Sequence, residues 1–228
     1  LPTRDIFLVA AALAIPLLWT LLRINGADIH FGRSCGAPDH HETKPDRVSR
    51  GYLFKDVRFL IFMTCLLLFQ LANASVLPQV SELLAHSEGR SSSLAVSALI
   101  VVPQLVVALL APWAGRTAET WGRRPLLLLG LAAVPIRSGL FAFTTDPTLL
   151  LITQTLDGFS GATLGVLTAL IVADLTDRTG RFNLAQGVVG TFSGIGASLS
   201  ALMTGAITQH FGYSAGLLSV TVVGLMAV

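Results

Sequence analysis

Seven apolar runs, separated by shorter polar connections, constrain the fold of this chain more than any other feature. Most of the runs reach the roughly 20 residues that a helix needs to cross about 30 Å of hydrocarbon. They show no alternation with a period of two and are longer than the roughly ten residues of a barrel strand, so helices are expected. The runs are Ile6–Leu22, Phe59–Val80, Leu94–Ala114, Leu126–Phe143, Leu149–Ala173, Leu184–Thr208 and Ala215–Val228.

The composition indicates a membrane protein. Of the 228 residues, 12% are charged and 53% are hydrophobic, and the mean hydropathy is +0.71. A soluble domain has about a quarter of its residues charged. The sequence therefore predicts an all-α membrane protein with seven transmembrane helices. Because the chain starts without a methionine and stops inside an apolar run, we expect a fragment whose last helix is truncated.

Lysine and arginine are distributed unevenly among the connections. The connections after the first, third and fifth runs carry seven, three and two of them, whereas the other side has only Arg4 and Arg90. Basic residues accumulate in the cytoplasmic loops of membrane proteins. We therefore expect a multi-pass protein of the plasma (inner) membrane with residues 25–58, 115–125 and 174–183 in the cytoplasm.

Residues 25–58 are too long and too polar for a turn and are interpreted as a linker between two helix bundles. The candidate metal ligands of this linker lack the spacing of a structural zinc site, so no metal is expected. They are His30, Cys35, Asp39, His40 and His41. The sequence has no phosphate-binding Gly-rich lysine loop, HExxH pair or nucleophile motif. We therefore expect neither an enzyme nor a cofactor.

The connection between the third and fourth runs has a glycine, an acid, a second glycine and a basic pair, namely Gly115, Glu119, Gly122, Arg123 and Arg124. This pattern resembles motif A of the major facilitator superfamily, with a glutamate where the family usually has an aspartate. A segment of the fifth run, Gln154–Gly158, is similar to motif B of the same family, with a glutamine in place of the usual arginine.

The resemblance implies a secondary active transporter with twelve helices in two six-helix halves. Residues 1–24 would be helix six, residues 25–58 the central loop, and residues 59–228 helices seven to twelve. We expect proton-coupled efflux of small amphipathic compounds by alternating access. The expected partners are the missing N-terminal half, the lipid bilayer and a small-molecule substrate, without nucleic acid. A seven-helix membrane receptor or a non-transporting sensor is the alternative, because it has the same number of spans.

By the same resemblance, the segment Gly115–Arg124 lies at the cytoplasmic mouth, where the two halves of the transporter touch or part. Either arginine of the basic pair could bind Asp174 or Asp177 at the end of the fifth run, and Glu119 could lie near the positive end of the next helix. In the simpler alternative, the arginines only set topology and contact lipid headgroups. The glycine spacing favours the gating hypothesis, because topology does not require it.

Two charged residues lie inside the apolar runs, Arg137 in the fourth and Asp157 in the fifth. A charge at this depth is costly and suggests a function. Their depths differ by only about 5 Å at 1.5 Å per residue, so a buried ion pair is feasible. Either the pair locks the bundle structurally, or Asp157 carries the transported proton. We favour the structural pair.

Four uncharged amides are the other candidates for a substrate or proton pathway, namely Gln70, Asn73, Gln104 and Gln154. In the resembled fold, helices seven, eight, ten and eleven line the cavity, which would admit all four. They can equally hydrogen-bond neighbouring helices for about 1 kcal/mol each, so both interpretations stay open. Two glycine pairs with small-xxx-small spacing, Gly161–Gly165 and Gly190–Gly194, predict close helix packing.

Overall fold

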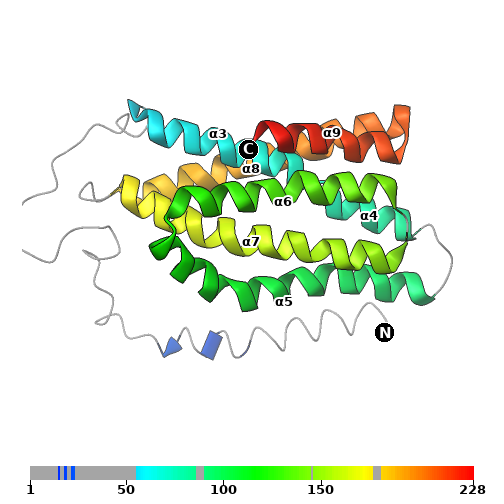
Figure 1. The fold of residues 1–228 in the computed structure, drawn as a ribbon, viewed down its shortest axis with the longest axis horizontal. Coiled ribbons are helices and arrows are strands. Elements are labelled where there is room, and N and C mark those ends of the chain that lie inside the picture. Colours follow the sequence, from blue (N-terminus) through cyan, green and yellow to red (C-terminus); the bar gives the residue numbers. More distant parts are fainter. Residues whose placement is uncertain are drawn as a thin grey trace, which may run out of the picture.

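The computed structural model describes residues 55–85, 90–144, 146–176 and 181–228, together with the isolated positions 15, 18, 19, 22 and 23. The four continuous ranges are all-α, as predicted, and their helices form an elongated bundle (Figure 1). Most of the predicted first span and linker lies outside the described residues. The helices are α3 (Val57–Asn73), α4 (Val76–Ala85), α5 (Arg90–Thr120), α6 (Arg123–Phe143), α7 (Pro147–Leu175), α8 (Phe182–Phe211) and α9 (Tyr213–Met226).

Five stretches are long and apolar enough to cross a membrane, and α9 is apolar but shorter. Large apolar side chains cover their outer surfaces: Leu109, Leu202 and Phe143 are 77%, 71% and 82% exposed. Helices that are apolar on all sides are typical of a lipid environment. The described bundle is therefore that of an integral, multi-pass membrane protein. The five stretches are Val57–Leu84, Leu94–Thr120, Arg123–Phe143, Pro147–Leu175 and Phe182–Phe211.

Helices α6 and α7 each make extensive contacts with two neighbouring helices. The most extensive contacts join α5 with α7, α6 with α7 and α9, and α3 with α8. The short turn between α6 and α7 is capped by Asp146, whose carboxylate accepts a hydrogen bond of 2.8 Å from the backbone N–H of Thr148. Pro147 fills the first helical position, where a missing N–H has no cost.

The second predicted span is not one helix, because α3 ends at Asn73 and α4 begins at Val76. At the break, the Ser75 backbone N–H donates to Ser200 Oγ over 3.2 Å. The Ser75 hydroxyl lies 2.8 Å from Thr204 Oγ1 and 2.8 Å from Ser200 Oγ. All three side chains are buried. The Ser200 hydroxyl of α8 therefore satisfies the backbone N–H at the break, and Thr204 binds the Ser75 side chain. No local sequence signal indicates these contacts.

Of the two predicted glycine pairs, Gly161 packs closely, because a Cβ there would lie 3.1 Å from Val107 Cγ2 of α5. Among the described atoms, a Cβ added to Gly165, Gly190 or Gly194 would have no neighbour within 4 Å. By contrast, a Cβ on Gly158 would lie 2.7 Å from the Pro103 carbonyl oxygen of α5. The packing prediction is therefore wrong for those three glycines, because spacing along one helix does not show which face meets a neighbour.

Candidate functional site

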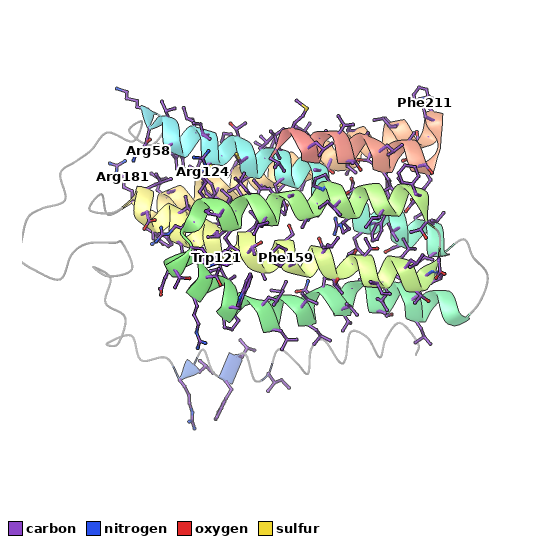
Figure 2. The ribbon with its side chains drawn as sticks, viewed as in Figure 1. Arg58, Trp121, Arg124, Phe159, Arg181 and Phe211 are labelled. Atoms are coloured by element: carbon purple, nitrogen blue, oxygen red, sulfur yellow. The ribbon has the colours of Figure 1, made fainter. Side chains whose placement is uncertain are left out.

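Basic side chains gather at one end of the bundle, which we term the basic end. Figure 2 shows Arg58, Trp121, Arg124 and Arg181 at this end and Phe211 at the opposite end. Helices α3, α6 and α8 begin here, and α5 and α7 end here. The resembled gating motif therefore lies where five helix ends meet.

The connection between α5 and α6 is much shorter than the predicted loop 115–125. Helix α5 continues through Thr120 and α6 begins at Arg123, so only Trp121 and Gly122 lie between them. Hydropathy indicates where the apolar run ends, but Arg116, Ala118 and Glu119, which follow, are good helix formers. Gly122 has φ 87° and ψ 164°, a backbone conformation that is essentially restricted to glycine. This residue makes the sharp turn possible.

Arg123 follows that turn and reaches the C-terminal end of α7. Its Nη1 donates a hydrogen bond of 2.8 Å to the Leu170 carbonyl oxygen, and its guanidinium forms an ion pair with Asp174. Both the carboxylate and the carbonyls near a helix C-terminus favour a cation. We term this contact the arginine clasp. The two charged side chains are 34% and 55% exposed, so the pair contributes about 1 kcal/mol or less and can break and re-form.

The other predicted gating residues lie outside the clasp. Arg124 forms no ion pair with any described residue, and the Glu119 carboxylate is exposed and has no partner in the same ranges. Gly115 lies inside α5, and Asp177 lies outside the described residues. From the predicted set, the structure thus brings together Arg123 and Asp174, and their gating role stays a prediction.

A second polar cluster lies inside the bundle between α3, α6 and α7. Arg137 is 1% exposed and forms an ion pair with Asp157. Its Nη2 also donates a hydrogen bond of 2.6 Å to Asn73 Oδ1. Gln154 is fully buried, and its Nε2 lies 3.4 Å from Asp157 Oδ2. We term these four residues the buried network, which joins the two charges and two of the amides singled out from the sequence.

The buried network retains hydrogen-bonding capacity. Arg137 Nε and Gln154 Oε1 are buried without a partner among the described residues. The Arg137 guanidinium also lies 5.9 Å from the ring centre of Phe141, a distance at which a cation–π attraction is weak but favourable. A buried polar atom without a partner costs about 1–3 kcal/mol. Removing one charge from the buried network should therefore change the free energy of unfolding strongly.

The remaining two amides lie elsewhere. Gln70 lines a cavity of about 380 Å³ between α3, α7 and α8, together with the polar side chains of Thr168, Gln186 and Ser193. Gln104 is exposed on α5. The four amides of the predicted pathway thus occupy the buried network, a separate cavity and an outer helix surface.

Taken together, a bundle of long apolar helices, an ion pair at one end and a buried ion pair inside define a class, that of multi-pass membrane proteins. Residues 59–228 match the family model described as Major Facilitator Superfamily, and the chain belongs to this family. An uncharacterized MFS-type transporter of Mycobacterium tuberculosis strain H37Rv is 35% identical over 218 residues, which are 94% of this chain and 51% of that protein. The chain thus spans about half the length of this relative.

Two further relatives have names that state a function. The tetracycline resistance protein, class B, of Escherichia coli is 33% identical over 114 residues, 50% of this chain and 26% of that protein. The multidrug efflux pump LfrA of Mycolicibacterium smegmatis is 32% identical over 118 residues, 51% of this chain and 23% of that protein. No solved structure gives a significant match. The resemblance to the major facilitator superfamily is confirmed, and the match fits its C-terminal half.

Proposed function

We propose that this chain forms the second half of a secondary active transporter that exports small amphipathic compounds by alternating access, driven by a proton gradient. The observation that carries this proposal is the arginine clasp at the basic end, formed directly after the turn at Gly122. The names of the tetracycline resistance and multidrug efflux relatives support the direction of transport and the compound class. The partner is the first six-helix half.

In alternating access, the two halves of a transporter part at one end while they close at the other. The clasp ties the turn between α5 and α6 to the end of α7, through the contacts of Arg123 with Leu170 and Asp174. Because its charges are partly exposed, little free energy is needed to release it. We propose that the clasp holds this turn rigid while the basic end is closed against the other half, on the cytoplasmic side, and that release accompanies opening.

We assign the buried network a structural role in this mechanism. A guanidinium as deeply buried as Arg137 needs an anion beside it, and Asp157 supplies that anion. Asp157 is also the one acid near the middle of a described span. It is therefore the residue through which the competing hypothesis, proton carriage by this half, would act. The hypotheses differ in whether a variant without both charges still couples flux to the proton gradient.

We propose that the cavity beside Gln70 contributes to the substrate pathway. Helices α3, α7 and α8 enclose it, and they correspond to helices seven, ten and eleven of the resembled fold. Its polar groups are uncharged amides and hydroxyls set among apolar side chains, a lining suited to amphipathic compounds.

The test is a flux assay on the full-length protein in proteoliposomes. The liposomes are loaded with a panel that includes tetracycline, a cationic dye and a neutral dye, and release is followed with and without an imposed pH gradient. We expect faster release of at least one compound under the gradient, and loss of that increase after a protonophore is added. If folded protein moves no compound in a gradient-dependent way, the proposed function is wrong.

A further inference from the structure

A second cavity lies at the end of the bundle opposite the basic end. It has a volume of about 520 Å³, within the range of about 300–1,000 Å³ that small-molecule sites occupy. Helices α4 and α8 and the start of α9 enclose it, so we term it the α4–α8 cavity. Most of its wall is apolar or small, with contributions from Ala74, Pro78, Leu83, Ala201 and Gly205.

Gln79 of α4 places an unused hydrogen-bond acceptor in this wall. Its side chain is only 8% exposed, and its Nε2 donates a hydrogen bond of 3.1 Å to Thr208 Oγ1. Its Oε1 is buried and has no partner in the described part of the chain. Gly216 allows α9 to press against this pair, because a Cβ there would lie 3.2 Å from Gln79 Oε1. The amide oxygen is thus buried against α9 without a donor, which costs about 1–3 kcal/mol unless a donor binds.

The surrounding charges favour a cation. Glu82 lies one turn after Gln79 on the same face of α4, and it is the charged residue in the described wall of the cavity. Thr208 and Gln209 belong to the last turn of α8, where the helix dipole adds partial negative charge. Tyr213 also lines the cavity, and its hydroxyl is buried without a partner among the described residues. Acceptors, a carboxylate and a helix C-terminus therefore converge on one space.

We infer that the α4–α8 cavity binds the ammonium head of an amphipathic amine. On binding, the Gln79 amide turns so that Oε1, which is buried in the structure, accepts a hydrogen bond from an ammonium N–H. The positive charge lies near Glu82, and the hydrocarbon body contacts the apolar wall. The site shares no residue with the buried network or with the cavity beside Gln70. It goes beyond the proposed function, because binding here requires neither a gradient nor transport.

Three fluorescent probes separate the charge from the hydrogen bond. Dansylcadaverine carries a primary ammonium, its trimethylammonium derivative keeps the charge without an N–H, and its N-acetyl derivative is uncharged. The full-length protein is placed in phosphatidylglycerol nanodiscs, and the Kd of each probe is measured. We expect the primary amine to bind about tenfold more tightly than the trimethylammonium probe, the value of one hydrogen bond from a charged donor, and the N-acetyl probe to bind most weakly.

Variants assign these differences to residues. Gln79→Leu is expected to weaken the primary amine about tenfold and to leave the trimethylammonium probe unchanged. Glu82→Gln is expected to weaken both charged probes about threefold to fivefold, as for an exposed ion pair. Asp146→Asn is the matched control, since it also removes an exposed carboxylate at this end and asparagine keeps the helix cap. If Gln79→Leu does not fold, Tyr213→Phe takes its place as the variant of the cavity wall, because it deletes only a hydroxyl.

Equal Kd values for the three probes on the unmodified protein would overturn the inference, as would Glu82→Gln and Asp146→Asn variants that bind alike. A lipid ammonium has the same chemistry, so half of the lipid is then replaced by phosphatidylethanolamine. A higher apparent Kd identifies the lipid as a competing occupant of the ammonium site, and an unchanged Kd assigns the site to free amines. Because no gradient is applied, loss of flux with retained binding would count against the proposed function alone.

Discussion

Removing one charge of the buried network should destabilise the protein much more than removing both. Asp157→Leu leaves the Arg137 guanidinium buried without its anion, and Arg137→Met leaves the carboxylate without its cation. The double variant Arg137→Met/Asp157→Leu removes both charges and fills the space with apolar atoms. We therefore expect the double variant to recover most of the stability that either single variant loses.

The magnitude follows from the burial of the pair. The Arg137 and Asp157 side chains are 1% and 23% exposed, and breaking a buried pair from one side costs about 3–5 kcal/mol. Asn73 Oδ1, 2.6 Å from Arg137 Nη2, remains as an acceptor in Asp157→Leu. We therefore expect about 3 kcal/mol for that variant and about 1 kcal/mol or less for the double variant, because apolar replacement of a buried pair is often neutral.

The assay is reversible unfolding of the full-length protein in mixed micelles with increasing sodium dodecyl sulfate. Arg116→Met is the control, since Arg116 is exposed at the basic end and its loss should change stability by about 0.5 kcal/mol or less. Additive losses in the double variant would refute the pairing. In the flux assay, a folded double variant that keeps gradient-dependent transport supports the structural role, and one that loses it assigns proton carriage to Asp157.

Two predictions concern the basic end. Arg123→Gln should raise the alkylation rate of a cysteine at position 120 about twofold to fivefold, because a partly exposed ion pair is lost. Arg124→Gln is the control and should leave this rate unchanged. Equal effects of the two variants would show that the clasp is not the relevant contact. Gly122→Ala should lower the free energy of unfolding by about 1–3 kcal/mol through backbone strain alone, since a Cβ there meets no described atom within 4 Å. Gly115→Ala, inside α5, should cost less than about 0.5 kcal/mol, and equal losses for the two glycines would refute the strain argument.

Hydrophobic length predicts the spans because lipid leaves the backbone no partner outside a helix. It does not predict where a helix ends, so the continuation of α5 to Thr120 was missed. It also does not predict the break at Ser75, since the partners of the Ser75 backbone N–H and hydroxyl, Ser200 and Thr204, lie far along the chain. Such tertiary partners are not visible in local sequence.

For the site, the chemistry was easier to predict than the geometry. Two opposite charges within apolar helices must find each other, so the pairing of Arg137 with Asp157 followed from their depths. Which arginine of the basic pair engages Asp174 depends on the turn at Gly122, which the spacing does not define. The acceptor at Gln79 was missed, because it becomes unusual only through its burial against another helix.

Alternating access is tested most directly by labelling rates at the two ends of one protein. In a variant without the native cysteines, single cysteines replace exposed Thr120 at the basic end and exposed His210 at the opposite end. The alkylation rate of each is measured in proteoliposomes before and after addition of a transported compound. Alternating access predicts that one rate rises while the other falls. Rates that stay constant, or that change in the same direction, would contradict it.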